Sequence, residues 1–178
     1  MTTDQPLGTV LHDGERRGLR YVRTYPHPLD AVWRAVTESQ HLRHWMPADL
    51  VGERRVGAPV ELPFWPEHVE RYGIEEPVLH GTIEAWDPPT RASWTWGGDV
   101  LLFELDETDD GTRLTFTTWL EIPDADAPGI VETGSGYHLC LDLLEDVLAG
   151  RPQPTGSIPD DVEKSMRARY VAAMGAEL

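Results

Sequence analysis

The chain has 178 residues, enough for one domain whose core is large enough to fold without disulfides or metals. Its 15 basic and 31 acidic residues give a formal net charge of −16, and so acidic a surface repels nucleic-acid phosphates and anionic lipid headgroups. Cys140 is the only cysteine, which excludes an intrachain disulfide and a thiolate metal cluster. No apolar run approaches the ~20 residues of a membrane span, and residues 1–6 do not resemble a signal peptide. We therefore expect a cytoplasmic protein that binds neither nucleic acid nor membranes.

The first third of the chain predicts a hairpin followed by two short helices. Residues 8–12 and 18–25 flank an Asp13-Gly14 dipeptide, which favours a tight turn between two strands. Apolar residues recur at helical spacing over residues 29–36, and residues 40–45 predict a second, shorter helix.

The next segment predicts a strand pair and then a long loop. Residues 50–53 and 56–64 carry the strand pattern. Residues 63–77 have no regular pattern, so we expect a loop there. Long ordered loops in compact domains often act as lids over a site.

Four strand-like runs follow, over residues 78–86, 91–96, 100–106 and 112–120. They are rich in β-branched and aromatic residues, and the segments between them hold the Gly, Pro and Asp residues of tight turns. The pattern predicts one antiparallel meander.

A long amphipathic helix is predicted over residues 130–149, with Tyr137, Leu141, Leu144 and Leu148 on one stripe. Packed against the meander, it gives an α+β fold in which a curved antiparallel sheet wraps around the helix. Such a sheet can enclose an apolar cavity, because the helix covers only part of its concave face. We expect a single domain over residues 1–178, with its core at about 8–150.

Residues 151–158 form a predicted linker to a last helix over residues 159–175. This helix carries an apolar stripe of Val162, Met166, Tyr170 and Met174 that must be covered. Either the helix folds back on its own chain or it packs on a symmetry mate. The sequence therefore predicts a monomer or a homodimer.

This order of elements resembles the helix-grip fold of the START-like and pollen-allergen-like superfamily, also called SRPBCC. More narrowly, it is similar to bacterial proteins named after the activator of heat-shock protein 90 ATPase. The resemblance rests on these segments: residues 31–37 with His44-Trp45, 81–89, 91–96, 111–115 and 136–144. It covers about residues 8–175, and it departs from the family at Tyr137, where Trp is usual.

Motifs for metal or covalent chemistry are weak. His41 and His44 are three residues apart on a short helix, but no third ligand follows from the spacing. Cys140 has no electropositive sequence neighbours and is predicted to fill the core. Glycines 134 and 136 inside the long helix indicate a close approach by a strand, a break in the helix or a ligand. We expect no metal and no cofactor.

Aromatic residues give the strongest indication of a site. The walls of a small-molecule cavity are predicted from these residues: Trp45, Trp94, Trp96, Phe103, Phe116, Tyr137 and Leu141. His138 is the expected polar group of that cavity.

Because no nucleophile, base and orienting group come together in the sequence, we expect non-catalytic binding of a small hydrophobic or aromatic molecule. The resemblance leaves two alternatives open. One is an aromatase/cyclase-like or hydratase-like enzyme, in which His138 with Glu104 or Tyr137 would move protons. The other is a stress- or chaperone-associated interaction protein.

Overall fold

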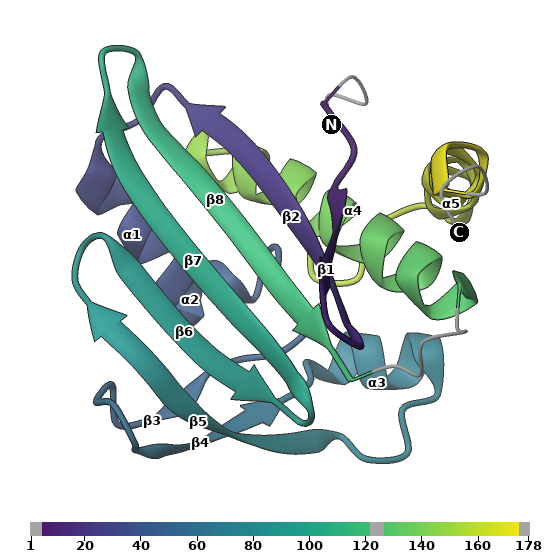
Figure 1. Cartoon of the computed structure of the whole chain (residues 1–178), viewed down its shortest axis with the longest axis horizontal. Coiled ribbons are helices and arrows are strands. Elements are labelled where there is room, and N and C mark those ends of the chain that lie inside the picture. The colour runs from purple at the N-terminus through teal and green to yellow at the C-terminus, as the bar shows by residue number, and fades with distance from the viewer. Residues whose placement is uncertain (1–4, 122–126, 175–178) are drawn as a thin grey trace.

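The structure is a computed structural model that describes residues 5–121 and 127–174. Within these residues, eight strands form one antiparallel sheet (Figure 1). The strands are β1 Thr9–Asp13, β2 Arg16–Tyr25, β3 Val51–Gly52, β4 Pro59–Pro63, β5 Val78–Asp87, β6 Arg91–Trp96, β7 Asp99–Thr108 and β8 Gly111–Leu120. The helices are α1 Leu29–Thr37, α2 Ser39–Leu42, α3 Pro66–Tyr72, α4 Ala127–Leu148 and α5 Asp160–Met174.

The strand order is β1-β2-β8-β7-β6-β5-β4-β3, so the predicted meander β5 to β8 is confirmed as the centre of the sheet. The β1–β2 hairpin joins the meander through β8, where Tyr21 lies opposite Phe116. The other flank consists of β4 and the two-residue β3. This arrangement places β2, near the start of the chain, beside β8, the last strand.

The long helix α4 crosses one face of the curved sheet and packs against β2 and α1 (Figure 1). The predicted α+β helix-grip fold is therefore confirmed. The helix begins three residues before the predicted start at residue 130. Leu141 and Leu144 of its predicted stripe are buried, whereas Tyr137 and Leu148 are partly buried.

The predicted loop over residues 63–77 is wrong in one respect, because it contains helix α3. Pro66 occupies the first turn, where its missing N–H costs nothing. Gly73 ends the helix in the left-handed conformation, with φ of 61°. Both signals are present in the sequence, but the helix is only seven residues long and shows no apolar stripe.

Helix α5 packs along α4, which covers its apolar stripe within the same chain. Met166, Tyr170 and Met174 are buried, and Val162 is partly buried. The predicted end of this helix at residue 175 lies outside the described residues.

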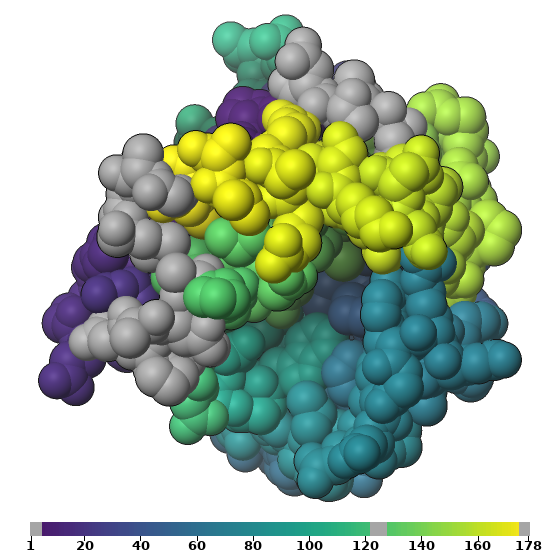
Figure 2. Space-filling view, turned by 90° about the vertical axis from the view of Figure 1, so that its right-hand side faces the viewer, coloured from purple at the N-terminus to yellow at the C-terminus, as the bar shows by residue number. Residues whose placement is uncertain are grey.

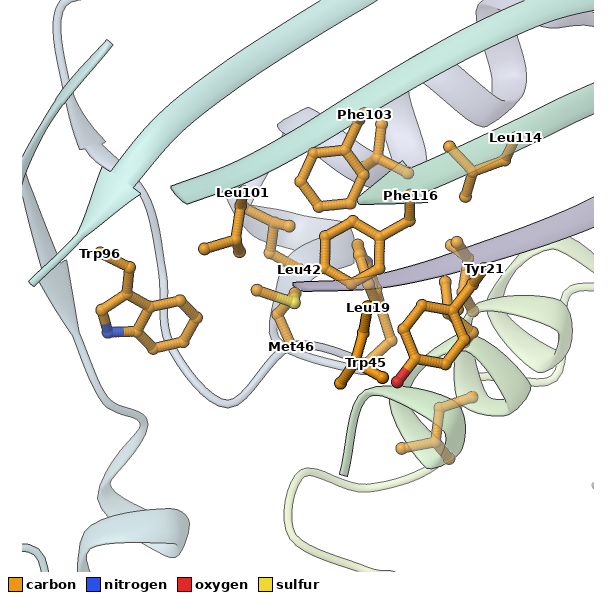
Figure 3. Close-up of a cluster of buried hydrophobic side chains, with 14 of the residues drawn as sticks. Leu19, Tyr21, Leu42, Trp45, Met46, Trp96, Leu101, Phe103, Leu114 and Phe116 are labelled. Atoms are coloured by element: carbon orange, nitrogen blue, oxygen red, sulfur yellow. The ribbon is translucent and has the colours of Figure 1, made fainter. Parts of the chain in front are cut away.

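The inner face of the sheet is filled by a ladder of stacked rings (Figure 3). Trp94 stacks on Phe103 with ring centroids 5.0 Å apart, and Phe103 stacks on Phe116 at 4.6 Å. Tyr21 continues the ladder at 5.8 Å from Phe116 and donates its hydroxyl to the Gly134 carbonyl of α4 at 2.8 Å. Side chains therefore fill the space between the sheet and the long helix at the centre of the fold.

Candidate functional site

A cavity of about 570 Å³ lies at one end of the grip, where α3, α4 and α5 meet the ends of β5, β6 and β7. Figure 2 shows this hollow below the yellow α5 and beside the blue α3. Its lining residues are Pro47, His68, Tyr72, Leu79, Trp96, Asp99, Glu132, Thr133, Ser135, Gly136, Tyr137, Leu139, Cys140, Ile158, Glu163, Lys164 and Arg167.

The apolar part of the wall comes from the sheet, α4 and the linker before α5. Trp96 and Leu79 supply it from β6 and β5, while Tyr137 and Leu139 supply it from α4. Tyr137 packs edge-on against Phe116 at 4.9 Å, so the core ladder holds this wall in place. The cavity lies within the size range of small-molecule sites.

Helices α3 and α5 are tied together beside the cavity by polar contacts. Arg71 contacts Asp160 at 2.8 Å and Glu163 at 3.3 Å, and it also donates to the Gly156 carbonyl at 3.0 Å. The Tyr72 hydroxyl donates to Glu163 as well, and burial followed by this contact raises the pKa of Tyr72 to about 12. Two helices that are far apart in the sequence thus form one wall.

Asp99 is the acidic group on the sheet side of the cavity. It is partly buried, and its Oδ1 accepts the backbone N–H of Glu121 at 2.8 Å. Burial raises the pKa of Asp99, the Glu121 N–H opposes this, and the Glu121 carboxylate adds to it. Burial also raises the pKa of the neighbouring Tyr137, with a further contribution from Asp99. Both side chains therefore favour their neutral forms more than free residues do.

The structure places the predicted wall residues in three different environments. Trp96 and Tyr137 line the cavity, and Trp45 borders a much smaller adjoining hollow. Trp45 is otherwise core: its Nε1 donates to the Ala35 carbonyl at 2.9 Å. The remaining predicted wall residues are buried in the core, away from the cavity lining: Trp94, Phe103, Phe116 and Leu141.

His138, the expected polar group, faces α5 and not the cavity. It is fully buried, and its Nδ1 lies 3.1 Å from the hydroxyl of Tyr170. Its Nε2 lies 3.8 Å from Asp142, a buried carboxylate without a hydrogen-bond partner among the described residues. Burial, then the charge of Arg23, lowers the pKa of His138 to about 3. Burial raises the pKa of Asp142 to about 6, although Arg23 opposes this shift.

The enzyme alternative required His138 to meet Glu104 or Tyr137 inside a cavity. Glu104 is exposed on β7, and neither it nor His138 lines the cavity. The described residues therefore do not bring these acid–base pairs together at the site.

Cys140 lines both hollows, and burial raises the pKa of its thiol to about 12, so it is a poor nucleophile. His44 donates from Nδ1 to the Gln153 carbonyl oxygen at 3.0 Å, and His41 Nε2 lies 3.9 Å from a carboxylate oxygen of Glu38. Among the described residues, no group of three side chains is placed to hold a metal ion. In the same part of the chain, no helix is long and apolar enough to cross a membrane.

Several cavity residues were not predicted, and Asp99 is the one that the sequence could have revealed. Leu101, Phe103 and Leu105 alternate along one strand and so share a face, and Asp99 lies two residues before that row. The register confirms its side, because Asp99 pairs with the inward-facing Trp96. The residues of α3 and α5 carried no such signal.

The fold is shared with solved structures of low sequence identity. A conserved protein of unknown function from Enterococcus faecalis has a TM-score of 0.72 and 16% identity, and the match covers 95% of this chain and 91% of that one. CalU16 from Micromonospora echinospora has a TM-score of 0.65 and 21% identity, and the match covers 98% of this chain and 99% of that one. The protein MLL2253 from Mesorhizobium loti has a TM-score of 0.61 and 22% identity, and the match covers 77% of this chain and 99% of that one. At these identities the likeness shows the fold alone.

No curated protein matches the sequence. The family model described as "Activator of Hsp90 ATPase homolog 1-like protein" matches residues 26–149, which span α1 through the end of α4. This segment is more than half of the chain and holds most of the sheet. The chain therefore belongs to the family of Activator of Hsp90 ATPase homolog 1-like proteins.

Proposed function

We propose that the protein binds a small hydrophobic or aromatic molecule in the cavity between α3, α4 and α5, without catalysing a reaction on it. The observation that supports this proposal is the cavity itself, about 570 Å³ in volume, with Trp96 and Tyr137 on its wall. Pockets of this size with apolar walls and a few polar groups are typical small-molecule sites.

The chemistry of the wall favours binding over catalysis. Cys140 is held as a neutral thiol, and the pKa of Tyr137 is raised by burial, so neither is activated as a nucleophile or a base. Burial also lowers the pKa of His68, which keeps the ring neutral. What these groups offer a ligand is apolar surface and hydrogen bonds.

Gly136 allows a sharp test, because it lines the cavity and a Cβ built there meets no other atom within 4 Å. Gly136→Trp should place an indole in the empty space without displacing the core. The probe is N-phenyl-1-naphthylamine, a neutral dye whose fluorescence rises in apolar sites. We expect saturable binding to the full chain and at least a tenfold weaker affinity in Gly136→Trp.

The matched control is Ala172→Trp, which adds the same side chain at an exposed position of α5 outside the cavity lining. It should bind the dye as the parent protein does. The proposal fails if the parent protein shows no saturable binding of the dye or of other neutral aromatic probes. It also fails if Gly136→Trp binds the dye as tightly as the control.

A further inference from the structure

Asp99 is an acidic residue in an otherwise apolar row of side chains. It begins β7, and the row continues through the buried Leu101 and Phe103 on the same face. Its Oδ1 is held by the Glu121 amide, which fixes the carboxyl group in place. Its second oxygen has no hydrogen-bond partner among the described residues. The carboxyl group thus presents a fixed acceptor to the cavity.

The other acidic residues on the cavity wall already have cations of their own. Glu132 pairs with Arg167, and Glu163 pairs with Arg71. Asp99 has no such partner in the described part of the chain. It is therefore the carboxylate of this site that a ligand cation could neutralise.

We propose that the cavity selects ligands that carry a protonated amine on an aromatic or apolar body, with Asp99 as the anchor of the amine. This inference rests on the proposed function and deepens it by naming the ligand class. The apolar body would lie against Trp96 and Tyr137, and the ammonium group would donate to the free oxygen of Asp99.

Three physical effects favour an amine over a neutral group at this position. A hydrogen bond between ions is about twice as strong as one between neutral groups, and partial burial strengthens it further. Trp96 and Tyr137 line the same cavity, and aromatic faces attract cations. The net charge of −16 raises the local concentration of cations around the molecule.

Lys164, if it recognised the ligand, would favour an anionic ligand over a cationic one. It lies on the α5 side of the cavity, it is exposed, and no carboxylate pairs with it among the described residues. If Lys164 dominated recognition, the preferred ligand would carry a carboxylate. We favour Asp99, because it is partly buried and oriented by the Glu121 amide, whereas an exposed lysine is hydrated and free to turn.

The test measures how three molecules of one shape displace N-phenyl-1-naphthylamine from the full chain. They are 2-naphthylmethylamine, which is cationic, 2-methylnaphthalene, which is neutral, and 2-naphthoate, which is anionic. Asp99→Asn removes the charge but keeps an oxygen that can accept the hydrogen bond from the backbone N–H of Glu121. Glu104→Gln is the control, since Glu104 is an exposed carboxylate on the same strand.

We expect the amine to bind about tenfold more tightly than 2-methylnaphthalene. Asp99→Asn should abolish this preference and leave the affinity for 2-methylnaphthalene unchanged, while Glu104→Gln should preserve the preference. Equal displacement by the amine and the hydrocarbon would overturn the inference and leave the proposed function intact. Preference for 2-naphthoate would overturn it in favour of Lys164, and failure of the dye and all three molecules to bind would remove the proposed function as well. The comparison within the parent protein remains decisive even if Asp99→Asn does not fold.

Discussion

Two glycines of α4, only two residues apart, should respond to the same substitution in opposite ways. A Cβ added at Gly134 would lie 2.8 Å from Cε1 and 2.9 Å from Cδ1 of Tyr170, whereas a Cβ at Gly136 would meet nothing within 4 Å. Both residues are inside the helix, so alanine improves helix propensity at each. The difference between the two variants therefore isolates the packing of α5 on α4.

The magnitudes follow from helix propensity and from the freedom of the Tyr170 ring. Gly136→Ala should stabilise the protein by about 1 kcal/mol, because alanine restricts the unfolded chain more than glycine does. Gly134→Ala has the same gain, but overpacking a close-packed site costs about 1–3 kcal/mol. The ring cannot move away freely, because its hydroxyl accepts the Gly8 N–H at 2.8 Å and lies 3.1 Å from His138.

Urea unfolding of the parent protein and both variants measures the difference directly. We expect Gly134→Ala to be less stable than Gly136→Ala by about 1–3 kcal/mol, with no change in the denaturant slope. In thermal unfolding this corresponds to about 2–4 °C per kcal/mol for a chain of this size. Equal stabilisation by the two substitutions would refute the packing of Tyr170 on Gly134.

Two further substitutions and one deletion test the buried contact between α4 and α5. Tyr170→Phe should cost about 2–4 kcal/mol in urea unfolding, because it leaves the Gly8 N–H and the His138 ring without their buried partner. Asp142→Asn should stabilise the protein by roughly 3 kcal/mol above pH 6. The reason is that burial raises the pKa of Asp142 from 3.8 to about 6, so that folding disfavours its charged form. The gain in stability should vanish below about pH 4, where the carboxyl group is protonated in both states. A stability difference from the parent protein that stays constant across this pH range would contradict this explanation. Deletion of residues 157–178 should lower stability and leave the number of chains per particle, measured by sedimentation, unchanged. A fall from dimer to monomer would instead show that α5 forms an interface between chains.

The elements of the grip could be predicted from the sequence because their signals are local. Turn residues such as Asp13-Gly14 separate neighbouring strands, and antiparallel neighbours in a meander pair with each other. The helical stripe of α4 is similarly a property of one segment. Helix α3 was missed because seven residues give too short a window for a periodic pattern, although Pro66 and Gly73 mark its ends.

The location of the cavity could not be predicted in the same way. Alternation along a strand correctly turned Trp94, Phe103 and Phe116 inward, but it does not say whether their rings leave space between them. That depends on register across four strands, which aligns the rings into a continuous stack. Similarly, the helical period placed His138 beside the stripe, but its partner Tyr170 lies 32 residues further along the chain.

Part of the cavity wall lies outside the segment that matches the family. The family match ends at residue 149, yet α5, which lies beyond that residue, contributes Glu163, Lys164 and Arg167 to the wall. Helix α3 lies between β4 and β5 and contributes His68 and Tyr72. Because the stacked rings fill the centre of the grip, substitutions of the cavity-lining residues of these two helices can reshape the site without disturbing the stack. Membership of the family therefore accounts for the fold, whereas ligand selectivity at the proposed site would depend on residues of α3, α5 and the adjoining strand ends, with Asp99 first among them.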